Sequence, residues 1–120
     1  MLVAVHLMHI PNSANYFMME RPSGYHPDNS RSIAGVLTTE PFGWKTHVAS
    51  PNGLFCAGHV QMSDGRIAVV GGHTANAGWP SGLNSIRIFD PSVNTLVNTT
   101  VLNYNRWYVR RWVPAGLGVG

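Results

Sequence analysis

The sequence predicts an all-β protein of short antiparallel strands, and three observations support this class. Thirteen glycines and eight prolines are spread over 120 residues, which favours frequent turns over long helices. The apolar stretches are short and are bounded by turn residues, as strands are. There is little of the alanine and leucine periodicity that long amphipathic helices show. At 120 residues the chain is within the range of one domain.

The first twenty residues predict two strands joined at a turn. Residues 2–10 are largely apolar and compatible with a strand, and an apolar run resumes at 16–19. Between them, residues 11–13 read Pro-Asn-Ser, which is typical of a turn.

The next stretch carries weaker signals. Residues 21–32 are rich in Pro, Gly, Asn and Ser, and predict a long loop. A weak strand is expected at 33–38. The stretch that follows, up to Gly53 and including Trp44, is expected to be irregular.

The second half predicts four closely spaced strands, at 58–62, 66–70, 85–89 and 95–102. Asp64-Gly65 forms the first hairpin turn, because both residues tolerate positive φ. The continuous apolar run 66–70 suits a strand buried on both faces, and Gly71-Gly72 closes it. In the third strand Ile86 and Ile88 alternate with Arg87, and residues 90–94 supply a second tight turn.

Four short strands with a double glycine after the second are typical of one blade of a kelch-type β-propeller. The predicted fold is therefore one complete four-stranded kelch-type blade plus partial blades of a β-propeller. An unrelated antiparallel sheet with ordinary hairpins would show the same spacing. Because blades bury their faces against neighbouring blades, a single blade with pieces of others should expose apolar faces and open edges.

Charge and composition exclude several functional classes. The net charge of +3 comes from few acids, and the only basic cluster is Arg106, Arg110 and Arg111, so nucleic-acid binding is not expected. A single cysteine, Cys56, rules out an internal disulfide framework. The apolar start lacks a basic region and no stretch approaches transmembrane length, so neither a signal peptide nor a membrane span is expected.

A more specific pattern is carried by seven short segments that together cover roughly residues 3–108: VAVHLMHIPN at 3–12, FMMERP at 17–22, FCAG at 55–58, SDGR at 63–66, VVGG at 69–72, FDP at 89–91 and NRWY at 105–108. In this order the segments resemble the N-terminal domain of glyoxal oxidases, which are radical-copper oxidases related to galactose oxidase. Each segment alone is common among kelch proteins, whereas the ordered set with Cys56 and Tyr108 at blade edges is specific.

This resemblance implies a secreted seven-bladed oxidase with copper near the propeller axis. It places Cys56 and Tyr108 as the two halves of a thioether-linked cofactor, with Tyr108 also a copper ligand. The cross-linked phenol would hold a radical, because a ring thioether lowers its oxidation potential. Aldehydes, or primary alcohols in the galactose oxidase branch, would be oxidised by O₂ with release of hydrogen peroxide.

The end of the chain departs from the family pattern. In the family the Arg-Trp-Tyr motif leads into Pro-Thr and a new blade, whereas residues 109–120 resemble neither strand nor blade. We therefore expect a partial oxidase domain over 1–108 and an aberrant tail over 109–120, as a frameshift or retained intron would produce. The family's second tyrosine and two histidines come from far downstream, so the chain alone is expected to be inactive.

Two other functions stay open on the sequence. One is a non-catalytic kelch-like interaction module that binds another protein through open strand edges. The other is a sugar-binding surface formed by Trp44 and Trp79. His6 and His9 should point to opposite faces of a strand, and the other four histidines occur singly, so no histidine is expected to bind a metal.

Overall fold

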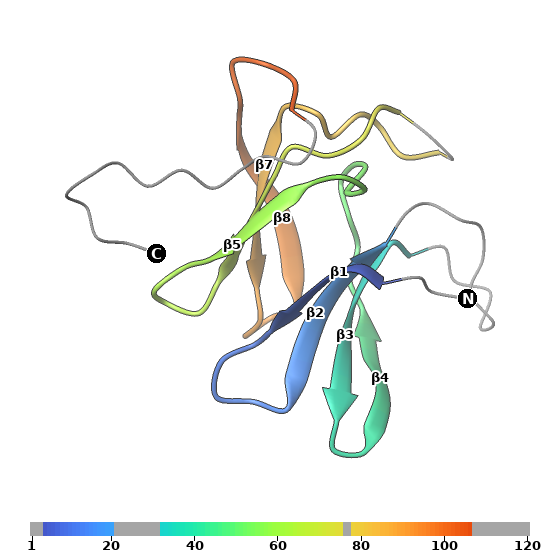
Figure 1. The fold of residues 1–120 in the computed structure, drawn as a ribbon, viewed down its shortest axis with the longest axis vertical. Helices are drawn as coiled ribbons and strands as arrows, with labels where there is room; N and C mark the ends of the chain where they lie inside the picture. The colour runs from blue at the N-terminus through green and yellow to red at the C-terminus, as the bar shows by residue number, and fades with distance from the viewer. Residues whose placement is uncertain (1–3, 21–31, 76–77, 107–120) are drawn as a thin grey trace.

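The computed structural model describes residues 4–20, 32–75 and 78–106. These residues form eight β-strands and no helix, in two separate four-stranded sheets (Figure 1). The predicted all-β class is therefore confirmed. Within the described ranges no helix is long and apolar enough to cross a membrane.

The first sheet has the order β1-β2-β3-β4 and is antiparallel throughout. Its strands are β1 (Ala4–His9), β2 (Asn15–Glu20), β3 (Ala34–Thr39) and β4 (Phe42–His47). The β1–β2 turn follows the Pro-Asn-Ser signal. Asn12 takes a positive φ of 56°, and the hydroxyl of Ser13 donates to the Ile10 carbonyl at 2.6 Å.

The strand β4 corrects the prediction of an irregular stretch before Gly53. Pro41 just before β4 and Gly43 within it are residues that usually interrupt strands, and β4 shows no alternation between buried and exposed positions. It is an edge strand that pairs only with β3, so one side of its backbone needs no ladder partner. The first half of the chain thus holds a complete four-stranded sheet rather than pieces of one.

The second sheet has the order β5-β6-β7-β8 and matches the four predicted strands closely. Its members are β5 (Gly58–Gln61), β6 (Ile67–Val70), β7 (Ser85–Asp90) and β8 (Thr95–Val101). A strand buried on both faces was expected at β6, but the two faces differ in burial. Ile67 and Val69 are fully buried, whereas Ala68 and Val70 are half-buried.

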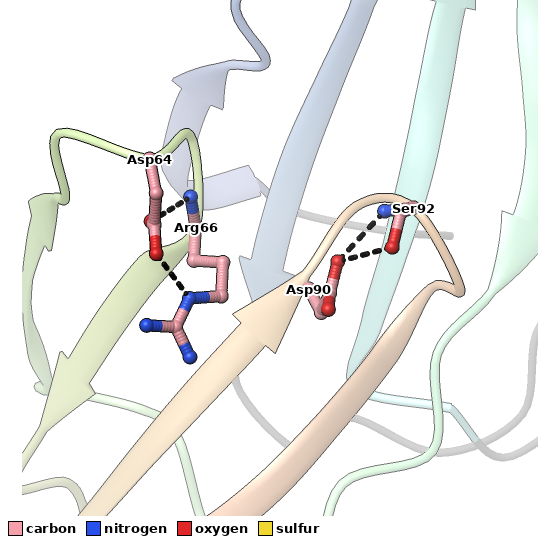
Figure 2. A network of polar contacts seen from close by, with 4 residues as sticks. All are labelled: Asp64, Arg66, Asp90 and Ser92. Atoms are coloured by element: carbon pink, nitrogen blue, oxygen red, sulfur yellow. Dashed lines mark hydrogen bonds and ion pairs between the residues drawn. The ribbon is translucent and has the colours of Figure 1, made fainter.

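The two hairpin turns of the second sheet are closed by aspartates, as Figure 2 shows. Asp64 accepts a hydrogen bond from the Arg66 backbone at 3.1 Å and pairs with the Arg66 guanidinium at 2.7 Å. Asp90 accepts from the backbone and hydroxyl of Ser92 at 2.9 and 2.6 Å. These hydrogen bonds favour the charged form, so the pKa of each aspartate lies below its usual value.

One core joins the two sheets. Phe17 of β2 stacks on Phe89 of β7 with ring centroids 4.0 Å apart and an interplanar angle of 11°. Buried side chains from both sheets surround this pair, including Met19 and Val36 from the first sheet and Ile67 from the second. The sheets therefore pack face to face, as stacked β-sheets do.

The outer face of the second sheet, which is turned away from this core, is also largely apolar. In the ladder register, directly opposite residues share a face. The outer face of the second sheet therefore carries six apolar side chains, five of them half-buried and Val97 55% exposed: Val60, Ala68, Val70, Ile86, Ile88 and Val97. The corresponding face of the first sheet includes Leu7 and Trp44, which are 52% and 42% exposed.

Candidate functional site

Cys56 lies in the segment that connects the two sheets, between β4 and β5. Its side chain is 5% exposed, its thiol is free, and its φ is 67°. The other non-glycine residues with positive φ in the described ranges are asparagines, which tolerate this conformation, whereas cysteine has no such preference. A backbone hydrogen bond from Ala57 to the Leu54 carbonyl at 3.0 Å closes the turn around it. The fold thus holds Cys56 in a backbone conformation that the residue itself disfavours.

Gly53, three residues before Cys56, packs backbone against backbone with two glycines from later in the chain, Gly72 and Gly82. A Cβ on Gly72 or on Gly82 would overlap the carbonyl oxygen of Gly53, so neither position accommodates a side chain. Gly53 also donates to the Pro80 carbonyl at 2.9 Å, and Gly82 donates to the His73 carbonyl at 2.8 Å. The backbone of the Cys56 segment therefore packs directly against the Gly71-Gly72 turn that follows β6.

The last described residues reach the same turn. Gly72 donates to the Arg106 carbonyl at 3.2 Å, and Arg106 donates to the Leu83 carbonyl at 2.7 Å. Tyr108, the expected partner of Cys56, lies two residues further on and outside the described residues. The structure thus brings the segment that carries Cys56 and the segment that leads to Tyr108 to one glycine, Gly72.

A fully buried arginine lies beneath this junction. The Arg87 guanidinium donates to the side-chain oxygen of Asn52 and to the Gly71 carbonyl, while its Nε is buried with no hydrogen-bond partner. Burial lowers the pKa of Arg87 to about 10. The Asn52 amide in turn donates to the hydroxyl of Ser85 at 2.8 Å and to Asn98 at 3.3 Å. Arg87 therefore links the Cys56 segment to the strands of the second sheet.

Sequence reasoning did not single out Arg87 as a functional residue. Its alternation with Ile86 and Ile88 was recognised, but the structure buries the arginine and leaves the isoleucines half-buried. The residues that could have indicated its role are Asn52, Gly71 and Gly82, which lie around the guanidinium in space and are small or polar. This indication depends on contacts between residues 16 and 35 positions apart.

The structure also pairs two histidines that the sequence treated singly. The rings of His6 on β1 and His59 on β5 meet edge to face with centroids 5.1 Å apart. Burial, and secondarily the charge of His59, lower the pKa of His6 to about 4, and burial also lowers the pKa of His59. As expected, His6 and His9 lie on opposite faces of β1: His9 is exposed and contacts Tyr16.

The described ranges contain no group of three His, Cys, Asp or Glu side chains that could hold a metal. The two tryptophans considered for sugar binding also have packing roles. Trp79 is partly buried against the core, and the Trp44 ring covers Gly35 so closely that a Cβ there would overlap it.

No known protein family, characterised protein or solved structure matches this chain. The function is therefore argued from the residues of the chain and their geometry.

Proposed function

We propose that this chain is part of a radical-copper oxidase of the glyoxal oxidase type, in which Cys56 and Tyr108 form a thioether. The observation that carries this proposal is the convergence on Gly72. Gly53 and Arg106 both contact Gly72, and they precede Cys56 and Tyr108 by three and two residues. Because two residues span at most about 7 Å and three about 11 Å, the chain allows the two side chains to meet.

The two stacked sheets support a propeller as the complete architecture. In a two-sheet sandwich the outward positions are polar, whereas here the outer face of the second sheet is apolar on all four strands. A face of this kind suits a further sheet stacked on it, as in successive propeller blades. We accordingly propose that the two sheets are two adjacent blades of a seven-bladed ring.

The conformation of Cys56 supports its assignment to the site. Non-glycine residues held in sparsely populated φ/ψ regions gather at functional sites, where the surrounding structure compensates the strain. Cys56 combines such a conformation with a buried, free thiol. A structural cysteine that only fills the core would need no positive φ.

The thioether would join Sγ of Cys56 to the ring carbon beside the phenol oxygen of Tyr108. The S–H bond and one ring C–H bond break, the C–S bond forms, and two protons and two electrons pass to dioxygen to give hydrogen peroxide. The linked sulfur then makes the phenol easier to oxidise. A copper ion bound to the Tyr108 phenol would supply the one-electron redox chemistry for aldehyde oxidation. The described residues do not by themselves form a site for that copper.

Peptide mass spectrometry tests the cross-link directly. The full chain is incubated with a copper(II) salt in air and digested with trypsin, which cuts after Lys45, Arg66, Arg106 and Arg110. We expect residues 46–66 and 107–110 to be recovered as one joined species, lighter than the sum of the two peptides by two hydrogen atoms.

Cys56→Ser and Tyr108→Phe are the matched controls. Cys56→Ser removes the thiol and Tyr108→Phe removes the phenol hydroxyl, so each variant should give two separate peptides. If the unmodified chain also gives separate peptides with a titratable thiol, the assignment of Cys56 and Tyr108 to a thioether is wrong for this chain. The exposed apolar faces then favour the second candidate, a non-catalytic module that binds another protein.

A further inference from the structure

Arg87 is an unusual residue for the middle of a sheet. Its side chain is fully buried, and its described hydrogen-bond partners are an amide oxygen and a backbone carbonyl rather than a carboxylate. A buried cation without an opposite charge is costly, and an apolar side chain of similar size would avoid that cost. The unpartnered Nε adds to it. Stability of the sheet therefore gives no reason for an arginine at this position.

The contacts of the guanidinium suggest what it does. One end bonds Asn52, four residues before Cys56, and the other bonds Gly71, whose neighbour Gly72 bonds Arg106. Nη1, the atom that bonds Asn52, also lies close to Gly82, where a Cβ would be 2.8 Å away from it. Arg87 is thus in contact with three segments: the one that leads to Cys56, the Gly71-Gly72 turn and the loop that contains Gly82. The planar guanidinium has several fixed donors and can bond separate acceptors at once, which a single apolar group cannot.

We infer that Arg87 is a positioning residue that clamps the Cys56 segment onto the Gly71-Gly72 turn and keeps the thiol buried and in place. The role of this clamp, to hold Cys56 where Tyr108 can reach it, rests on the proposed function. The clamp itself rests only on the contacts of Arg87.

Thiol alkylation tests the clamp without any copper chemistry. The rate at which iodoacetamide modifies Cys56 is measured in the folded full chain, well below its melting temperature. We expect Arg87→Met to raise this rate roughly tenfold or more, because the segment then opens locally. Arg87→Lys keeps the charge and one bond, and should give an intermediate rate.

Two controls separate the clamp from general stability. Val36→Ala removes a buried side chain of β3 and should lower the melting temperature without speeding alkylation. Arg66→Met removes an arginine of the exposed 64–66 turn and should change neither quantity. If Arg87→Met does not fold, Arg87→Lys is compared with Val36→Ala instead. An alkylation rate no faster than that of Val36→Ala would overturn the inference.

Thioether yield gives the second measurement. We expect the joined 46–66 and 107–110 species to fall in Arg87→Met and to recover partly in Arg87→Lys. Equal yields from the unmodified chain and Arg87→Met would overturn the positioning role. If the unmodified chain forms no thioether while alkylation still depends on Arg87, the clamp stands and only the proposed oxidase site fails.

Discussion

At the scale of single residues, the His6–His59 pair makes stability depend on pH. The folded state holds His6 with a pKa of about 4, against 6.5 for an ordinary histidine, so between these values the unfolded state binds the proton more strongly. The free energy of unfolding should therefore fall as the pH drops from about 6.5 towards 4. Because the ring is only half-buried and partly screened, we expect a loss of about 1–2 kcal/mol. Urea unfolding across this range measures it.

Substitution of single histidines identifies the source of that dependence. His6→Phe should reduce the pH dependence, leaving the smaller contribution of His59, whereas His9→Phe, on the other face of β1, should leave it unchanged. The range stays above 3.8, the ordinary aspartate value, so the turn aspartates contribute little. A His6→Phe chain with the full pH dependence would show that the pair is not responsible.

Arg87 and Cys56 also illustrate residue-scale specificity. Each is held in a state that its own chemistry disfavours: Arg87 as a buried cation and Cys56 with positive φ. Such local conflicts are expected at functional sites, where neighbouring contacts offset their cost. Both residues belong to the same junction, which strengthens the case that the junction is more than a turn.

At the scale of elements, the end of β6 depends on close backbone packing. Gly72→Ala should lower the free energy of unfolding by about 1–3 kcal/mol, because its Cβ would overlap the Gly53 carbonyl and separate the two segments. Chemical denaturation measures the change.

Gly43 provides a matched comparison for that substitution. It has nearly the same φ as Gly72, 159° against 158°, but nothing lies within 4 Å of a Cβ there. Gly43→Ala should therefore cost less than Gly72→Ala, because only the backbone strain that the two positions share remains. Equal losses for the two variants would assign the effect to backbone conformation and not to packing.

At the scale of the whole molecule, the apolar outer face of the second sheet, on which Val97 is 55% exposed, should make the isolated chain self-associate. Large exposed apolar patches usually mark interaction surfaces. Val97→Lys places a charge on this face and should at least halve the fraction of the chain that is associated. Light scattering of the concentrated chain measures this as a shift of the average mass towards that of the monomer. In a complete propeller, a further blade would pack on this same face.

Val93→Lys is the control for that measurement. Val93 is 63% exposed, more than Val97, but it lies in the 90–94 turn and not on the outer face. It should leave association unchanged. Equal effects of the two lysines would mean that net charge, and not the apolar face, governs association.

Much of the fold could be predicted because its signals are local. Asp64-Gly65 and residues 90–94 specify tight turns through their own side chains, as the aspartate hydrogen bonds in Figure 2 confirm. Apolar runs between such turns then predicted all four strands of the second sheet within one or two residues. β4 was missed because an exposed edge strand has no burial pattern to recognise.

The sequence by itself therefore determined the all-β class, the turns and most strands, since short-range propensity and hydrogen bonding suffice for these. Only the tertiary structure decided that Arg87 points inward, that His6 meets His59, and that Gly53 and Arg106 meet at Gly72. These contacts join residues 16 to 53 positions apart. Their physical reason is the face-to-face packing of the two sheets and their connecting segments, which no local pattern of residues encodes.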